Sequence, residues 1–222
     1  RVWLGAKRMV DVAGAGTALA ASLPLTFGLA AAVKLGSPGP VFYRGLRVAK
    51  NGVPFRMLKF RTMVVDAEKI GGASTSGDDP RVTRVGAWMR RYKLDELPQL
   101  LNVLMGDMSI VGPRPEVLSE VAWYSAEQRR VLDLRPGITD WASIWNSDEG
   151  EVLRGAPDPH AAYKEVIQPT KLRLQCKDRD SLGPLTDLRI VLGTARKLIQ
   201  PEWMPVELRE YGVPGQRAGA CQ

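Results

Sequence analysis

The sequence predicts a mixed α/β (α+β) protein that is mostly helical, with a small irregular sheet and an N-terminal re-entrant membrane helix. Three observations favour this fold. Residues 12–33 form an uncharged run rich in alanine and leucine. Short apolar segments flank an Asn-Gly turn at residues 51 and 52, and leucines recur at helical spacing between residues 94 and 104. We therefore divide the chain into a membrane segment with its connector at residues 1–40, a main domain at 41–200 and a tail at 201–222.

The composition excludes several classes of protein. Of the 222 residues, 45% are hydrophobic and 25% charged, which is a globular composition. One histidine and two cysteines exclude a disulfide framework, a zinc site of four cysteines or of two cysteines and two histidines, and a two-histidine mechanism. We expect Cys176 and Cys221 to be free thiols in a reducing compartment.

The positive charge is concentrated near the N-terminus. Residues 1–65 hold ten basic side chains and one acidic side chain, whereas residues 66–222 hold 21 and 23. Such a basic region favours a polyanionic partner, either nucleic acid, anionic lipid headgroups or a phosphorylated substrate. The adjacent apolar run favours membrane lipids, and the lack of a nucleic-acid-binding motif disfavours nucleic acid.

Residues 12–33 are 22 uncharged residues, which as a straight helix would extend about 33 Å, roughly one hydrocarbon core. Basic residues flank the run on both sides, which favours both ends staying in the cytoplasm. Pro24 lies near the middle and predicts a break, so that the helix enters one leaflet and returns, with Ser22, Thr26 or protein packing satisfying the opened backbone. A straight span, a buried soluble helix and a signal peptide are the alternatives.

Beyond the connector, residues 41–43 and 54–61 are predicted to be strands around the turn at 50–52. Because the alternation of apolar and polar residues is imperfect, Lys59 points either to solvent or into a site. Residues 66–80 are predicted to be a polar loop.

A helix is predicted to begin near Asp95 or Glu96 and to end at Gly106, because Pro98 fits only a first helical turn. Two adjacent carboxylates then lie at a helix N-terminus, where the dipole favours negative charge and also attracts phosphate. The simplest alternative is that Asp95 is only an N-cap. The cations just upstream form either part of a site or a solvated surface: Arg81, Arg84, Arg90, Arg91 and Lys93.

Arg114 is held between two prolines, which present its guanidinium from a stiff, extended segment. A planar fork of this kind suits phosphate oxygens, and a structural ion pair is the alternative. Arg135-Pro136-Gly137 predicts a type II turn. Residues 186–199 predict an amphipathic helix that lies on a membrane or in the core. His160 follows the helix start at Asp158 and is expected to be a surface or structural residue.

In their order along the chain, these motifs resemble the bacterial sugar transferases, the monotopic phosphoglycosyl transferases. The matching segments are Lys7-Arg8 with Asp11, the apolar run with Pro24, Lys59-Phe60-Arg61-Thr62-Met63, Leu94-Asp95-Glu96-Leu97-Pro98-Gln99-Leu100, Asn102-Val103-Leu104, Gly106-Asp107-Met108-Ser109, Val111-Gly112-Pro113-Arg114-Pro115 and Arg135-Pro136-Gly137-Ile138-Thr139. The likeness covers about residues 7–145 and continues more loosely to about residue 199.

The resemblance implies a monotopic enzyme of the bacterial inner membrane, with its catalytic domain at residues 41–200 on the cytoplasmic side. Such an enzyme transfers a sugar 1-phosphate from a UDP-sugar to polyprenyl (undecaprenyl) phosphate and releases UMP, the first membrane step of glycoconjugate or polysaccharide assembly. By this likeness Asp95 is the nucleophile that carries the phosphosugar, Glu96 is its partner, and Mg²⁺ is the cofactor with Asp95 as a ligand. Lys59, Arg90 and Arg114 match basic positions and are candidates for phosphate contacts.

Two departures from the family pattern stand out. Many relatives have serine before the helix-breaking proline, whereas this chain has Leu23, with Ser22 one position earlier. Many relatives continue with glycine after Thr139, whereas this chain has Asp140. The alternative function is a non-catalytic, membrane-attached module that binds phosphorylated ligands or supports assembly, and a homodimer is one option for the oligomeric state.

Overall fold

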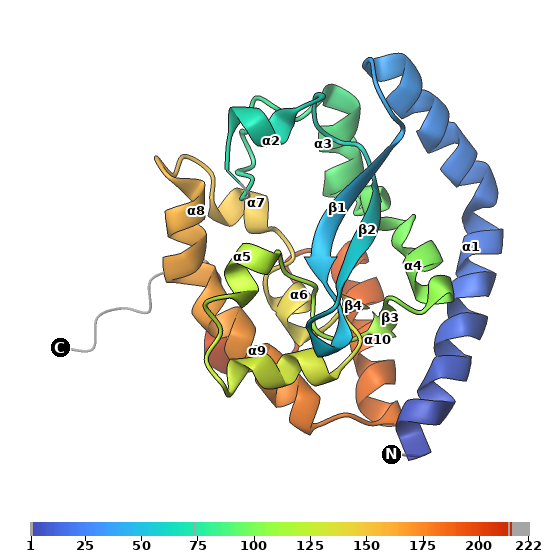
Figure 1. The fold of residues 1–222 in the computed structure, drawn as a ribbon, viewed down its shortest axis with the longest axis vertical. Helices are drawn as coiled ribbons and strands as arrows, with labels where there is room; N and C mark the ends of the chain where they lie inside the picture. Colours follow the sequence, from blue (N-terminus) through green and yellow to red (C-terminus); the bar gives the residue numbers. More distant parts are fainter. Residues whose placement is uncertain (1, 73, 213, 215–222) are drawn as a thin grey trace. The chain divides into compact units, whose positions relative to one another are not determined.

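The computed structural model describes residues 2–72, 74–212 and 214, and it confirms a mixed α/β fold that is mostly helical (Figure 1). The chain packs into two compact units. The first contains the chain up to Ala67 and Pro80–Ile138, and the second contains Glu68–Asp79 and the chain from Thr139 onward. This grouping by contacts differs from the sequence division at residues 40 and 200, because the N-terminal helix is part of the first unit.

Helix α1 runs from Val2 to Gly36 without interruption, so the break predicted at Pro24 does not occur in the hydrogen-bonded helix. Proline removes only its own amide donor, and the neighbouring turns keep their bonds. Ser22 Oγ donates to the carbonyl oxygen of Leu19 at 3.1 Å, as expected of a serine near the proline, whereas Thr26 Oγ1 has no partner among the described residues. The helix changes direction partway along its length (Figure 1).

Both halves of α1 are attached to the first unit. Near its start, Arg8 donates to the carbonyl oxygens of Val103 and Leu104 at 2.5 and 2.9 Å. Ala15 is buried in a core cluster with Leu100, Val103 and Met108. Near the other end, Leu29 and Val33 pack in a second cluster with Phe60 and Met89. The two ends of the helix are therefore held against the same body of protein.

The opposite face of α1 is apolar and uncovered. Phe27 is 71% exposed and Leu35 is 88% exposed, and other large apolar side chains on the helix are exposed as well: Met9, Val10, Val12, Leu23 and Leu25. The helix is long and apolar enough to cross a membrane by length and composition. An uncovered apolar surface of this size is suited to lipid rather than to water.

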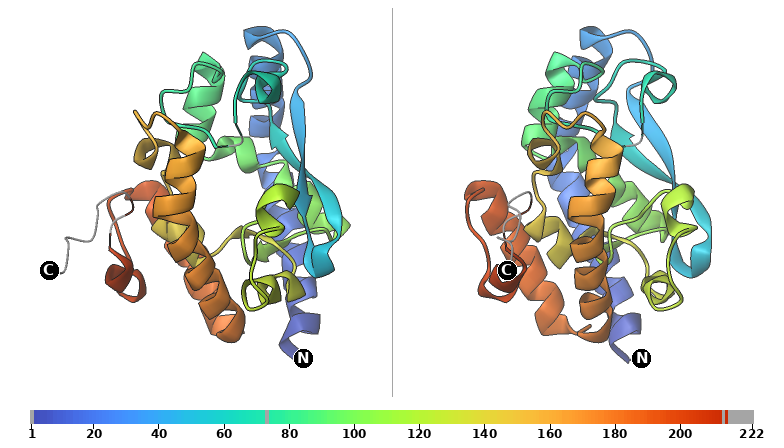
Figure 2. Two further views of the ribbon diagram at one scale, coloured as in Figure 1. Left: turned by 60° about the vertical axis from the view of Figure 1, so that its left-hand side comes forward. Right: turned by 90° about the vertical axis from the view of Figure 1, so that its left-hand side faces the viewer.

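The predicted hairpin is confirmed. Strand β1 (Phe42–Val48) pairs antiparallel with β2 (Pro54–Phe60), with Phe42 opposite Phe60 and Val48 opposite Pro54, and both views of Figure 2 show the twisted pair. The tight connection η1 (Lys50–Gly52) places Asn51 at φ 61° and Gly52 at φ 78°, which is why this Asn-Gly pair suits the turn. The first strand is longer than predicted.

After the hairpin, the first unit contains α3 (Arg84–Arg91), the 3₁₀ turn η2 (Leu94–Glu96), α4 (Gln99–Met105) and β3 (Ser109–Val111). Gly106 ends α4 at φ 96°, as predicted. The short elements α5 (Leu118–Val121) and η3 (Gln128–Asp133) follow. Asn102 ties α4 to the hairpin, because its side chain accepts from Leu58 N at 2.8 Å and donates to Arg56 O at 2.9 Å.

The type II turn predicted at Arg135-Pro136-Gly137 is wrong. Gly137 does not adopt the positive φ that such a turn requires, and it begins strand β4 (Gly137–Thr139), which pairs with β3. A Cβ atom on Gly137 would collide with the backbone nitrogen and oxygen of Gly112. The glycine therefore permits a close backbone approach rather than a turn.

The remaining helices lie in the second unit, apart from α2 (Ala67–Ile70), which begins at its boundary. They are α6 (Trp141–Trp145), α7 (Glu149–Val152), α8 (Pro159–Ala162), η4 (Tyr163–Ile167), α9 (Gln168–Asp180), α10 (Pro184–Ile199) and η5 (Val206–Tyr211). Asp158 caps α8 by accepting from His160 N and Ala161 N, and His160 Nδ1 lies 3.2 Å from Ser74 Oγ, consistent with the predicted structural role. Cys176 forms no disulfide with another described residue, and Cys221 lies outside the described residues.

Candidate functional site

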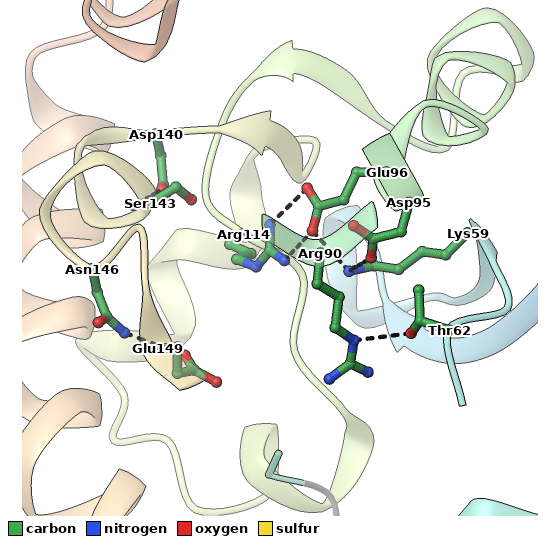
Figure 3. Close-up of polar contacts among 10 residues, drawn as sticks. All are labelled: Lys59, Thr62, Arg90, Asp95, Glu96, Arg114, Asp140, Ser143, Asn146 and Glu149. Atoms are coloured by element: carbon green, nitrogen blue, oxygen red, sulfur yellow. Dashed lines mark hydrogen bonds and ion pairs between the residues drawn. The ribbon is translucent and has the colours of Figure 1, made fainter. Parts of the chain in front are cut away.

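Four of the residues that the sequence singled out converge in the first unit. Strand β2 supplies Lys59, the turn before α4 supplies Asp95 and Glu96, and the segment after β3 supplies Arg114. Figure 3 shows their side chains pointing toward one another. Residues far apart in the sequence are thus joined by the packing of β2, η2 and β3 around α4.

Glu96 lies at the centre of this cluster. Its Oε1 atom accepts from Lys59 Nζ at 2.7 Å and from Arg114 Nη2 at 2.5 Å, and its Oε2 atom accepts from Arg114 Nη1 at 3.3 Å. Burial by itself would raise the pKa of Glu96, but the charges and hydrogen bonds of Arg114 and Lys59 outweigh it and hold the pKa well below its usual range. Glu96 is therefore a fixed anion that orients two cations.

Asp95 is buried and only loosely paired. Its Oδ2 atom lies 3.9 Å from Lys59 Nζ, and among the described residues it accepts no hydrogen bond. It makes no capping bond to η2 or to α4, so the N-cap alternative for Asp95 is wrong. The reason is that Lys93 begins the turn in the left-handed region, at φ 56°, which places Asp95 inside the turn instead of before it.

Arg114 and Lys59 both face the acidic pair. The stiff segment between the two prolines presents Arg114 as a two-pronged donor to Glu96, so the ion pair considered from the sequence is present. Lys59 is partly buried and points into the site rather than to solvent.

Arg90 and Pro24 also belong to the first unit, but they lie outside the cluster around Glu96. Arg90 Nε donates to Thr62 Oγ1 at 2.9 Å, and Arg90 is not among the cations that bond Asp95 or Glu96 within the described chain (Figure 3). Pro24 lies within α1. The bond to Thr62 attaches α3 to the segment that follows β2, which places Arg90 at the border of the site.

Two polar side chains of α4 near this cluster lie in the matching motifs, but the sequence analysis gave them no role. Asn102 is fully buried and bonds the backbone of β2 on the N-terminal side of Lys59. Gln99 is also buried, one helical turn earlier. Both residues interrupt the leucine stripe of α4, and a polar residue on an otherwise apolar helix face is the signal that could have identified them.

The fold and the site together define a class of protein: a helix-rich α/β protein with an acidic pair oriented by fixed cations, in a unit that also holds a long apolar helix. The chain belongs to the bacterial sugar transferase family, whose model matches residues 2–201.

The chain is similar to several sugar-phosphate transferases. It is 45% identical to a UDP-glucose:undecaprenyl-phosphate glucose-1-phosphate transferase of Caulobacter vibrioides, over 87% of this chain and 69% of the relative. It is 42% identical to a transferase of the same description from Escherichia coli, over 65% of this chain and 32% of the relative. It is also 42% identical to a UDP-N-acetylgalactosamine-undecaprenyl-phosphate N-acetylgalactosaminephosphotransferase of Aeromonas hydrophila, over 62% of this chain and 33% of the relative. The chain therefore spans about a third of the length of the last two proteins.

Proposed function

We propose that this chain transfers a sugar 1-phosphate from a UDP-sugar to polyprenyl phosphate and releases UMP. The observation that carries the proposal is the buried Asp95 carboxylate, which accepts no hydrogen bond within the described chain beside a Glu96 that is fully engaged by cations. A carboxylate without strong partners keeps its lone pairs for attack on phosphorus. The names of the relatives supply the donor and acceptor classes.

The reaction consists of two displacements at one phosphorus atom. An oxygen of Asp95 attacks the phosphorus that bears the sugar, and the bond from that phosphorus to the UMP phosphate breaks, so that UMP leaves with the electron pair. An oxygen of polyprenyl phosphate then attacks the same phosphorus, and the bond to Asp95 breaks. The carboxylate is regenerated, and the product is a polyprenyl diphosphate sugar.

The other members of the cluster orient the reactants. Lys59 lies between the two acids, so its ammonium can bind a donor phosphate oxygen while it remains close to Asp95. Arg114 is fixed by its two bonds to Glu96, and a planar guanidinium held in this way suits phosphate oxygens. Arg90, at the border of the site, is proposed as a further phosphate contact. Fixed cations of this kind stabilise the negative charge of the transferring group.

We also propose Mg²⁺ as the cofactor, with Asp95 as its protein ligand. Glu96 is occupied by Lys59 and Arg114, whereas Asp95 has oxygen atoms that accept no hydrogen bond within the described chain. Within the described residues, no group of three or more acidic, histidine or cysteine side chains could hold a metal ion. One carboxylate together with donor phosphate oxygens fits magnesium, which is commonly bound in this way. When bound, the ion neutralises the diphosphate and the departing UMP.

We infer that the protein is monotopic in the bacterial inner membrane, with its main domain on the cytoplasmic side. The exposed apolar face of α1 suits lipid, and Asp11 near its start accepts from Ser109 Oγ at 2.8 Å while Leu29 and Val33 pack on Phe60 and Met89. A full span would pull one end of the helix away from the unit that holds both. The homodimer stays a prediction.

The topology is tested by labelling single cysteines in a background without Cys176 and Cys221. Gly5→Cys lies near the start of α1, where a Cβ atom meets no neighbour, and Lys50→Cys lies in the exposed hairpin turn. Both positions should react only with a reagent that has reached the cytoplasm. Labelling of the two positions from opposite sides of the membrane would contradict the monotopic arrangement.

The reaction is tested with UDP-sugars that carry a radioactive label in the phosphate next to the sugar. The wild-type protein with Mg²⁺ should take up label and release UMP, and addition of polyprenyl phosphate should transfer the label to lipid. Asp95→Asn should fold with an unchanged melting temperature but acquire no label. If no donor in a broad panel gives labelled protein or UMP, the chain is a non-catalytic binding module instead.

A further inference from the structure

Gln99 is a buried amide without a partner in the part of the chain that the structure describes. It is the first residue of α4 and is 1% exposed, and neither its Oε1 nor its Nε2 atom makes a hydrogen bond there. A buried polar group that is left unpaired lowers the stability of the fold. Buried amides are nearly always paired in folded proteins, so an exception of this kind points to a function.

Gln99 lies one turn beyond the acidic pair of Asp95 and Glu96. The backbone between them stays helical, with Leu97 at φ −51° and ψ −39° and Pro98 at φ −62° and ψ −17°, and Leu100 N bonds Leu97 O at 3.1 Å. The backbone bonds in this stretch join residues three apart, as in a 3₁₀ turn, so Gln99 follows Glu96 on one face and Asp95 lies beside them in the preceding turn. Helical side chains also lean toward the N-terminus, which directs the Gln99 amide toward the turn that holds Asp95.

Contacts on either side of Gln99 along the chain fix its place in the first unit. One turn later on the same helix, Asn102 bonds the backbone of β2 at Arg56 and Leu58. One turn earlier, Glu96 bonds Lys59, the next residue of that strand. Gln99 therefore lies between the contact that fixes α4 on β2 and the cluster of Asp95, Glu96 and Lys59.

We propose that Gln99 is a positioning residue for the Asp95 nucleophile. This inference rests on the proposed function and deepens it. When the donor phosphate enters, Gln99 Nε2 donates to the Asp95 oxygen that does not attack, and the other oxygen is thereby directed at phosphorus. The bonded oxygen becomes the carbonyl oxygen of the acyl phosphate, which still accepts a hydrogen bond. A neutral amide orients the carboxylate without the permanent ion pair that would reduce its reactivity.

The test is Gln99→Met, which keeps the length of the side chain and removes both polar atoms. Replacing an unpaired buried amide with an apolar group should leave the melting temperature unchanged or raise it. The rate at which label from the UDP-sugar is transferred to the protein should nevertheless fall by about tenfold to a hundredfold, because the attacking oxygen is no longer held in line. The KM for the donor should change little, since Gln99 does not bind the nucleotide.

Gln175→Met is the matched control. Gln175 is also 1% exposed, but its Nε2 atom donates to Asp140 Oδ2 at 3.0 Å in the second unit. Because Gln175→Met loses this hydrogen bond, the melting temperature of the variant should be lower than that of the wild type. The rate of label transfer per folded protein should stay unchanged. Gln99→Met should therefore lose reactivity but not stability, whereas Gln175→Met should lose stability but not reactivity.

Three results would overturn the proposal. The rate for Gln99→Met could equal that of the wild type, its melting temperature could drop as far as that of Gln175→Met, or its KM could rise while kcat stays constant. Gln99→Leu, which is smaller and also apolar, should behave like Gln99→Met and guards against misfolding caused by the shape of methionine. A wild-type protein that never takes up label would contradict the proposed function itself and this inference with it.

Discussion

Lys59 Nζ lies 2.7 Å from Glu96 Oε1, although the two residues are 37 positions apart in the chain. The contact joins strand β2 to the turn before α4, and Arg114 completes it from the segment after β3. Because the cluster depends on three elements, its parts should respond differently to substitution.

Glu96→Gln should weaken both stability and activity. The substitution leaves the Lys59 and Arg114 charges partly buried without their anion, and we expect a loss of about 2 kcal/mol near neutral pH. The folded-state pKa of Glu96 is below its ordinary value of 4.5, so its stabilising effect is present above that pH and is lost as the pH falls through the lowered pKa. Thermal unfolding in detergent across pH should show the gap between wild type and variant closing in acid. A gap that stays constant to low pH would contradict the proposed ion pairs.

Arg114→Lys should retain the charge but lose the two-pronged contact with Glu96. A lysine ammonium is a point donor and cannot bridge Oε1 and Oε2 as the guanidinium does. We expect the rate of label transfer to the protein to fall by about tenfold, the size of effect that about 1.4 kcal/mol produces. Arg173→Lys on the exposed surface of α9 is the control and should be neutral. Equal rates for the two variants would exclude a role for the fork geometry of Arg114.

Asp178→Asn should change how stability depends on pH. Burial, together with the nearby charges of Asp140 and Asp187, raises the pKa of Asp178 from 3.8 to about 8. A raised folded-state pKa stabilises the protein fully below pH 3.8, and this contribution is lost as the pH rises toward 8, at up to about 1.4 kcal/mol per pH unit. Asparagine can still accept from Trp141 N and does not ionise. Melting temperatures between pH 4 and 9 should fall less steeply for the variant, and parallel curves would rule out titration of this group.

Gly137→Ala should change the position of Arg114, although the two residues lie in different sequence motifs. A methyl group at Gly137 collides with the backbone of Gly112, two residues before Arg114, and overpacking of this kind costs about 1–3 kcal/mol. We expect lower stability and slower label transfer. Gly16→Ala is the control, because a Cβ atom there meets no neighbour and alanine favours a helix. If Gly137→Ala matches this control, β3 and β4 tolerate a wider separation than the structure indicates.

The chain by itself determined the local elements and indicated the candidates for the reacting groups. The Asn-Gly pair at 51 and 52 specifies its tight turn, Gly106 ends α4, and the leucine spacing gives a helix, because each depends on the preferences of neighbouring residues. The order of motifs around Asp95, Glu96 and Arg114 was also enough to indicate the family. Two predictions from local sequence preferences were wrong. Pro24 does not interrupt α1, and Gly137 forms a strand instead of a turn because Gly112 packs against it.

Only the tertiary structure decided which charges meet. It directed Lys59 into the site, bonded Arg114 to Glu96 and Arg90 to Thr62, and left the amide of Gln99 without a partner in the described chain. These outcomes depend on the packing of β2, α3, α4 and β3 together. Side-chain pairing across such distances is fixed by burial and by the geometry of the assembled core, neither of which is encoded in the spacing of any single segment.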